Sequence, residues 1–162
     1  MTKIRRAKVE DAEAAAAAYE AAWDAAHAEQ LGKKLGELID SSHVAEAFRD
    51  GVAKTGDGSQ IFVADSDDGI AGLAIVVSAG DGTGELTHLY VRPDQWGRGI
   101  GTALHASSIR ELEAMGASKL TLWVAEANQR ARDFYVQAGW APDGQTRQSP
   151  LGPTELRYTM SP

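Results

Sequence analysis

Apolar residues occur along the chain in two kinds of segment, short dense runs and longer stretches with helical spacing. Four short runs have the length and composition of β-strands: 4–9, 60–64, 70–77 and 119–125. Four longer stretches have the periodicity or the end signals of helices: 11–29, 38–52, 101–115 and 128–138. Two further strands are expected from Trp140 onward and over 154–160. The pattern predicts an α/β domain with helices packed on a sheet.

Two local connections follow from the order of these segments. The turn at 65–69 joins two apolar runs and predicts a β-hairpin. A strand beginning at Glu85, the helix at 101–115 and the strand at 119–125 form a βαβ unit, so the two strands are expected to be parallel. The apolar phase of the first strand changes near 87–88. A β-bulge explains this change, and a strand buried on both faces explains it about equally well.

The stretch that follows the strand has the composition of an anion site. Glycines 97, 99 and 101 alternate with Arg98 and Ile100, and a helical pattern begins at Thr102. Backbone N–H groups converge at a helix N-terminus and bind phosphate well, while glycine permits positive φ and close approach. Arg98 can add a charge-assisted contact. The P-loop and Rossmann patterns fit poorly, because no Lys-Ser/Thr ends the loop and Thr102 stands where a third glycine belongs.

Composition limits the alternatives. A chain of 162 residues is expected to form one domain over 1–162. It contains no cysteine and no long apolar run, so we expect a cytoplasmic protein without disulfides, secretory signal or transmembrane helix. The net charge of −7 argues against a nucleic-acid partner. The four histidines lie singly at 27, 43, 88 and 105, and no metal site is predicted.

Two segments together resemble one known family. The residues from Glu85 to Leu104, followed by the Asn128 to Trp140 segment, are similar to the GNAT superfamily of N-acetyltransferases, in order and in spacing. The resemblance implies a mixed central sheet of six to seven strands, antiparallel at first, with a parallel splayed pair in the middle and about four flanking helices. It also implies acetyl-CoA as cosubstrate, and it favours the bulge as the explanation of the phase change.

The resemblance also assigns residues to the cofactor. Those expected to contact acetyl-CoA are Leu89, Tyr90, Val91, Trp96, Gly97, Arg98, Gly99, Ile100, Gly101, Thr102, Asn128, Arg132 and Tyr135. Trp96 stands where the family carries Gln or Arg, so backbone amides rather than a polar side chain are expected to act there. Leu89 and Val91 are expected to offer backbone groups to the pantetheine arm.

Acetyl transfer to an amine requires a neutral amine and stabilisation of the departing thiolate. The resemblance makes Glu85 the first candidate base, directly or through water, because some family members carry a catalytic glutamate at this position, eleven residues before Trp96. His88 and Glu126 are the alternatives. The resemblance assigns to Tyr135 a proton or hydrogen bond for the thiolate. Because a tyrosine near pKa 10 gives up its proton reluctantly to a thiolate near 8.5, the hydrogen bond is the simpler role.

The acceptor is the least readable part of the sequence. Tyr19, Trp23 and His27 share one helical stripe, which is expected to be core, with an acceptor-pocket wall as the alternative. The resemblance implies a primary amine of a small molecule or a peptide as substrate, and a monomer or homodimer. A non-catalytic acyl-CoA-binding module of the same fold is the alternative function.

Overall fold

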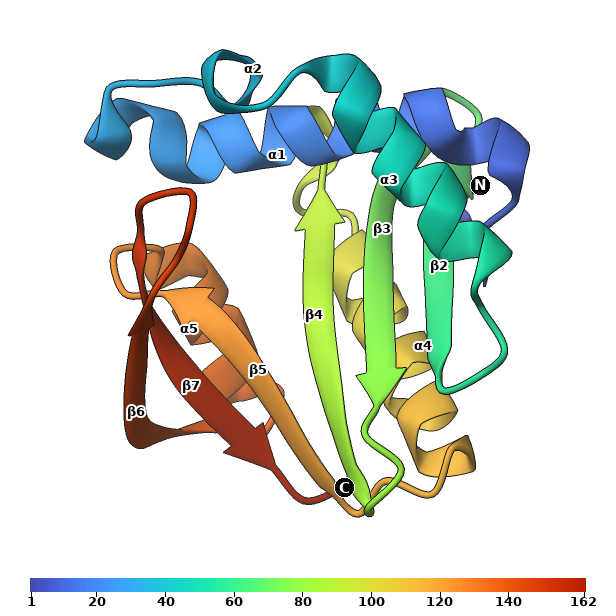
Figure 1. Cartoon of the computed structure of the whole chain (residues 1–162), viewed down its shortest axis with the longest axis vertical. Helices are drawn as coiled ribbons and strands as arrows, with labels where there is room; N and C mark the ends of the chain where they lie inside the picture. The colour runs from blue at the N-terminus through green and yellow to red at the C-terminus, as the bar shows by residue number, and fades with distance from the viewer.

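A seven-stranded sheet forms the centre of the computed structural model, which describes residues 1–162 (Figure 1). The strands are β1 (Lys3–Arg6), β2 (Ser59–Ser66), β3 (Gly69–Ser78), β4 (Thr83–Val91), β5 (Lys119–Ala125), β6 (Ala141–Gln148) and β7 (Thr154–Met160). Their order is β1-β2-β3-β4-β5-β7-β6, and only β4 and β5 are parallel neighbours. The predicted mixed sheet with a central parallel pair is confirmed.

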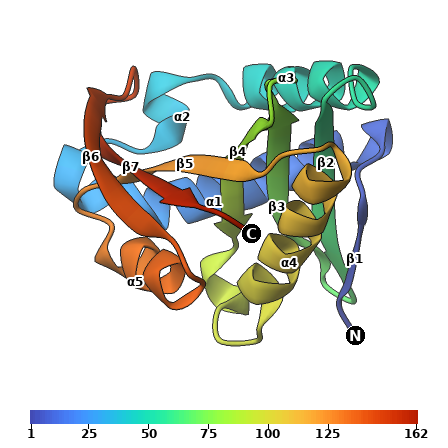
Figure 2. The same ribbon diagram turned by 90° about the horizontal axis from the view of Figure 1, so that it is seen from below.

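Helices lie on both faces of the sheet (Figures 1 and 2). They are α1 (Ala12–Leu31), α2 (Leu35–Leu38), α3 (Ser41–Ala53), α4 (Ile100–Ala114) and α5 (Gln129–Gln137), with single 3-10 turns η1 (Val9–Asp11) and η2 (Pro93–Gln95). One hydrophobic core joins α1 and α3 to β2 and β3, and a larger one joins α4 and α5 to the opposite face. No helix is both long enough and apolar enough to cross a membrane.

The two central strands separate soon after they begin. β4 and β5 pair at only three positions, Thr83 with Lys119, Gly84 with Leu120 and Glu85 with Thr121. Beyond Glu85 the strands diverge (Figure 1). At this joint α4 lies directly against the sheet, because a Cβ added to Gly84 would stand 2.7 Å from Leu112 Cδ2. The splayed pair is therefore held together by a short parallel ladder and a tight helix contact.

A β-bulge explains the change of phase in β4. His88 pairs with Ile75 of β3 and Leu86 pairs with Val76, so Thr87 is the additional residue. The Thr87 hydroxyl donates a hydrogen bond to the Ile75 carbonyl at 3.1 Å. The bulge places His88 beside Ile75, on the α1 face, while Leu86 belongs to the core under α4. The predicted bulge is confirmed, and it directs side chains of β4 to both sides of the splay.

The N-terminal boundaries differ from the sequence prediction. The first strand ends at Arg6 rather than Val9, because η1 follows it. Asp11 does not cap α1 with its side chain, since its carboxylate accepts from Arg5 at 2.8 and 2.9 Å and from the Lys8 N–H at 2.8 Å. A buried arginine–carboxylate pair therefore replaces the expected cap.

The second predicted helix, over 38–52, begins instead at Ser41, and the short helix α2 precedes it. The backbone is extended at Ile39 and Asp40, which ends the single turn of α2, and Asp40 then caps α3 by accepting from the Ser42 N–H at 2.8 Å. His43 lies near the start of α3, as predicted. A strong N-cap residue at position 40 explains why the chain begins a new helix there.

Candidate active site

The glycine loop ends in a set of free backbone donors. Gly97 and Gly99 both have φ of 77°, a conformation that favours glycine. Gly99 is the N-cap of α4, and the first intrahelical bond runs from the Ala103 N–H to the Gly99 carbonyl at 3.0 Å. The N–H groups of Ile100, Gly101 and Thr102 therefore have no partner within the helix. This arrangement can hold the phosphates of a nucleotide cofactor.

A cavity of about 740 Å³ begins at this loop and extends to α5. Eleven residues expected at the cofactor line it: Leu89, Tyr90, Val91, Trp96, Gly97, Gly99, Ile100, Gly101, Thr102, Asn128 and Tyr135. Because β4 pairs with β5 only as far as Glu85, the backbone groups of β4 beyond it that point toward β5 are left for another partner. Cavity, free amides and free strand groups together fit an elongated phosphorylated cofactor.

Arg98 and Arg132 do not line this cavity. A terminal nitrogen of Arg98 lies 3.4 Å from Gln95 Oε1. Arg132 donates to the Tyr158 hydroxyl at 3.1 Å and to the Glu126 carbonyl at 3.0 Å, so its guanidinium joins α5 to β7 and to the end of β5. A direct contact of either arginine with the cofactor stays a prediction.

Arg130 is a cavity residue that sequence reasoning missed. Its guanidinium carbon lies 3.6 Å from the centre of the Trp96 ring, and the Trp96 indole N–H donates to the Val91 carbonyl at 2.9 Å. The tryptophan thus connects the glycine loop to β4 and supports a cation at the cavity wall. The position of Arg130, two residues after Asn128 in the segment that resembles the family, was the available signal.

Tyr135 lies at the inner part of the cavity with its ring fixed by aromatic neighbours. Only 8% of the residue is exposed, and its ring centre lies 5.4 Å from that of Phe134 and 6.2 Å from that of Trp140. Trp140 is itself held by a 2.9 Å hydrogen bond from its indole N–H to His105 Nε2. Burial raises the pKa of Tyr135, so the hydroxyl stays protonated and can donate.

Asn128 has the predicted helix-capping role. Its side-chain oxygen accepts a hydrogen bond from the Ala131 N–H at 3.2 Å, and its carbonyl accepts from the Arg132 N–H at 3.0 Å. The cap fixes the start of α5 and thereby the direction from which Tyr135 enters the cavity. Asn128 lines the cavity as well, so capping and a place beside the cofactor coexist.

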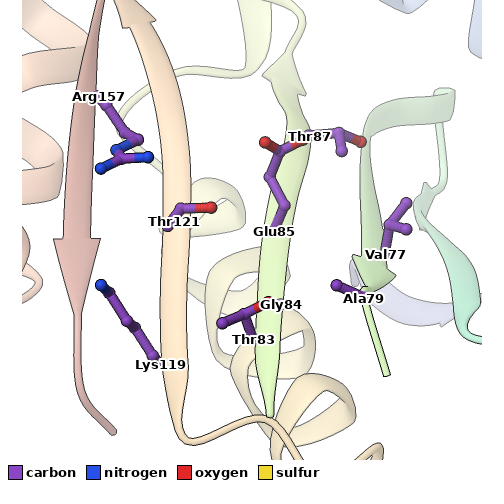
Figure 3. Close-up of a pocket in the computed structure, with 9 residues that line it drawn as sticks. All are labelled: Val77, Ala79, Thr83, Gly84, Glu85, Thr87, Lys119, Thr121 and Arg157. Carbon is purple, nitrogen blue, oxygen red and sulfur yellow. The ribbon is translucent and has the colours of Figure 1, made fainter. Parts of the chain in front are cut away.

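Glu85 lies in a different pocket, on the sheet face opposite α4 (Figure 3). This second pocket has a volume of about 460 Å³ and crosses the joint of the splayed strands. Its lining residues are Val77, Ala79, Thr83, Gly84, Glu85, Thr87, Lys119, Thr121 and Arg157. The site thus has two halves along β4, one with Glu85 before the bulge and one with Tyr135 beyond it.

His88 lies next to the bulge, between the two halves. Its Nδ1 is 3.0 Å from Thr87 Oγ1, whose own proton goes to Ile75, so the ring donates from Nδ1 and leaves Nε2 as a free acceptor. Its ring centre is 5.8 Å from that of Tyr19 and 6.0 Å from that of Tyr90. Burial lowers the pKa of His88 to about 4, so the ring is neutral at physiological pH.

Two of the three residues in the aromatic stripe of α1 are buried. Trp23 and His27 pack edge to face with ring centres 5.1 Å apart, as expected for core. Tyr19 is partly exposed and meets the Tyr90 ring edge to face, 4.8 Å between centres, but it lines neither pocket, so an acceptor-pocket wall stays a prediction. Tyr19 therefore lies beside the part of β4 that has separated from β5. No histidine belongs to a group of three or more side chains that could hold a metal ion.

The sheet order, the splayed parallel pair, the bulge and the glycine loop before α4 define the GNAT acetyltransferase fold. The family model described as "Acetyltransferase (GNAT) family" matches residues 15–140, and the chain belongs to that family. The match includes the glycine loop, β4, β5, Glu85 and Tyr135, and it ends before Arg157 of the second pocket.

Relatives agree with this assignment. An uncharacterised N-acetyltransferase of Mycobacterium tuberculosis is 35% identical over 92 residues, which are 57% of this chain and 58% of the relative. A mycothiol acetyltransferase of Beutenbergia cavernae is 40% identical over 60 residues, 37% of this chain and 20% of that protein. The PaiA N-acetyltransferase from Thermoplasma acidophilum, solved in complex with coenzyme A, superposes with a TM-score of 0.81 at 17% identity, covering 100% and 99% of the two chains. This structural likeness shows the fold.

Proposed function

We propose that the chain transfers an acetyl group from acetyl-CoA to a primary amine of a small molecule or a peptide, by direct attack in a ternary complex. The observation that carries this proposal is the pair of pockets along β4. The cavity with the glycine loop and Tyr135 is lined by β4 from Leu89 to Val91, and the pocket with Glu85 is lined by the same strand from Thr83 to Thr87. A thioester in the first and an amine in the second can therefore approach each other near the bulge at Thr87.

The residues of the larger cavity fit acetyl-CoA, which supplies the thioester carbonyl and a thiolate leaving group when bound. The free amides of Ile100, Gly101 and Thr102 can accept its pyrophosphate, and Arg130 on Trp96 adds a positive charge at the wall. Backbone groups of β4 beyond Glu85 can bind the pantetheine amides. These contacts use the chain's backbone more than its side chains.

The amine must lose a proton before it attacks. An amine of pKa about 10.4 is neutral in only ~1 part in 2,500 at pH 7, which costs roughly 4–5 kcal/mol. In the proposed mechanism Glu85 accepts that proton, directly or through a water in the second pocket, and such a base contributes about 10²–10⁴-fold in rate. His88 Nε2 is the alternative acceptor, although its lowered pKa makes it the weaker base.

Two donors stabilise the charge that develops during transfer. A backbone N–H of β4 near Leu89 is proposed to meet the oxyanion, because the bulge frees this part of the strand from pairing with β5. The Tyr135 hydroxyl is proposed to donate a hydrogen bond to the departing thiolate, since its raised pKa favours a donor that keeps its proton.

The test is thiol release from acetyl-CoA over a panel of primary amines and peptides with free N-termini. We expect release with one class of acceptor and at least a tenfold loss of kcat/KM in Glu85→Gln. Glu126→Gln is the matched control, because this exposed glutamate at the end of β5 is absent from both pockets and should leave the rate unchanged.

Binding measurements separate the alternatives. Calorimetry should show that acetyl-CoA binds the wild type and Glu85→Gln equally. Binding of acetyl-CoA without turnover of any amine would favour the non-catalytic acyl-CoA-binding module. A chain that bound no acetyl-CoA would contradict the proposal for both halves of the site.

A further inference from the structure

The second pocket has opposite charges on its two sides (Figure 3). Glu85 lies on β4, two residues before the bulge at Thr87, and Thr83 and Thr87 flank it on the same strand. Lys119 of β5 and Arg157 of β7 lie on the other side, and Thr121 of β5 lies between them and Glu85. The pocket therefore has one carboxylate facing two cations, in a chain whose net charge is −7.

Arg157 is anchored so that most of its donors stay free. Its Nε donates to Asp143 Oδ2 at 2.6 Å, and the other oxygen of Asp143 accepts from the Gln145 N–H at 3.0 Å. The terminal nitrogens of Arg157 make no hydrogen bond within the chain, while the residue lines the pocket. A guanidinium fixed through Nε presents its remaining N–H groups as a planar fork that suits a carboxylate or a phosphate.

Lys119 adds a second, unpaired charge. It lies at the start of β5, opposite Thr83 in the parallel ladder, and it has no ion-pair partner. Both cations lie on the same face of the sheet, since Lys119, Thr121 and Arg157 all line the pocket. Asp143 offsets part of both charges, since the Gln145 N–H, Arg157 and Lys119 all lower the pKa of its carboxyl group, but it is not a lining residue. Arg157 and Lys119 are therefore the charged side chains that this side of the pocket presents to a ligand.

We infer that the acceptor amine also carries an anionic group, which Arg157 and Lys119 hold while the amine lies on the Glu85 side of the pocket. This inference rests on the proposed acetyl transfer and specifies the class of its acceptor. β4 and β7 are separated by β5, so their backbones stand about 10 Å apart where β4 and β5 pair, and farther apart at Arg157, which pairs with Trp123 of β5 beyond the last position paired with β4. Side chains of both strands line the pocket between them. That spacing suits an acceptor in which a short chain separates the amine from the anion.

The test compares acceptors that differ only in the anion. The series runs from glycine through 4-aminobutyrate to 6-aminohexanoate, each beside its neutral carboxamide, with aminoalkyl phosphonates of matching length to distinguish the two kinds of anion. At one chain length we expect kcat/KM of the anionic acceptor to exceed that of its carboxamide at least tenfold. The effect should arise from a lower KM rather than from a higher kcat. Arg157→Gln should reduce this ratio to within threefold, mainly by raising the KM of the anionic acceptor.

The matched control is Arg147→Gln, on the neighbouring strand β6. Arg147 is paired with Glu155 at 2.8 Å and is absent from the pocket, so its substitution should preserve the tenfold ratio. Lys119→Gln should lower the ratio by a smaller factor than Arg157→Gln.

Three outcomes would overturn the inference while acetyl transfer stands. These are equal rates for the anionic acceptors and their carboxamides, equal loss for both in Arg157→Gln, or turnover confined to amines without an anion. If no acceptor turns over, the inference is tested instead by NMR titration of the anionic acceptors into the protein bound to coenzyme A. Saturable binding that Arg157→Gln abolishes supports the inference, and no binding refutes it. Failure of acetyl-CoA itself to bind would instead contradict the proposed function.

Discussion

Replacing Tyr135 by phenylalanine removes only the hydroxyl group, and the structure allows an estimate of how much that hydroxyl contributes to the rate. The ring remains packed between Phe134 and Trp140, so the fold and the cavity shape should be preserved. Burial raises the pKa of Tyr135, and the hydroxyl is therefore a hydrogen-bond donor rather than a proton source for the thiolate. A hydrogen bond to a charged group contributes about 1.5–3 kcal/mol, which corresponds to roughly 10- to 150-fold in rate.

The assay is single-turnover thiol release at saturating acetyl-CoA and acceptor, which isolates the chemical step. We expect the loss of roughly 10- to 150-fold in the rate constant, with the dissociation constant of acetyl-CoA and the melting temperature unchanged. The wild-type rate should show no loss from ionisation of Tyr135 up to pH 10, since its pKa lies above the usual tyrosine value. A rate within threefold of the wild type would refute the role of the hydroxyl.

Three stability predictions follow from other contacts. Gly84→Ala should lower the free energy of unfolding by about 1–3 kcal/mol in urea titrations, because the new Cβ would stand 2.7 Å from Leu112 Cδ2. Asp11→Asn should cost about 2 kcal/mol by breaking the two-point pair with Arg5. Burial lowers the pKa of His88 to about 4, so stability should fall by about 2–3 kcal/mol as pH decreases from 6.5 to 4, and His88→Phe should reduce that slope.

Each of these has a control in the same chain. Gly36→Ala meets no atom within 4 Å at a glycine without positive φ, so it should leave stability unchanged or raise it. Asp67→Asn removes only an exposed pair with the N-terminal amine and should have little effect. If Gly84→Ala matched Gly36→Ala, or Asp11→Asn matched Asp67→Asn, the close packing or the buried pair would be less important than argued. A pH slope that persisted in His88→Phe would point to His27 or His105, whose pKa values burial also lowers.

Local sequence patterns were sufficient where neighbours in the chain are neighbours in space. The phase change at Thr87 follows directly from the two-residue period of a strand, and the glycines at 97 and 99 have the positive φ that only glycine adopts easily. The same holds for Asn128, whose capping bond spans three residues. Element boundaries were less secure, since Asp11 had a partner, Arg5, that competed with the helix N-terminus.

Features made by distant segments could not be read from the sequence. Arg130 meets Trp96 only because α5 lies beside the glycine loop. Lys119 and Arg157 share a pocket with Glu85 only because β5 lies between β4 and β7 in the sheet order. The net charge of −7 gives no indication of this local pair of cations. Predicting the charge of such a pocket requires the strand order of the sheet, which sequence periodicity does not specify.

The short ladder between β4 and β5 has a consequence for amide hydrogen exchange. Only Thr83, Gly84 and Glu85 of β4 have partners on β5, so those amides of residues 86–91 that point away from β3 lack a protecting backbone acceptor. They should exchange quickly in the free protein, while the amides that face β3 exchange slowly. A ligand lying along this open side would slow the fast set alone, so exchange along a single strand would report the occupancy of the site without any catalytic turnover.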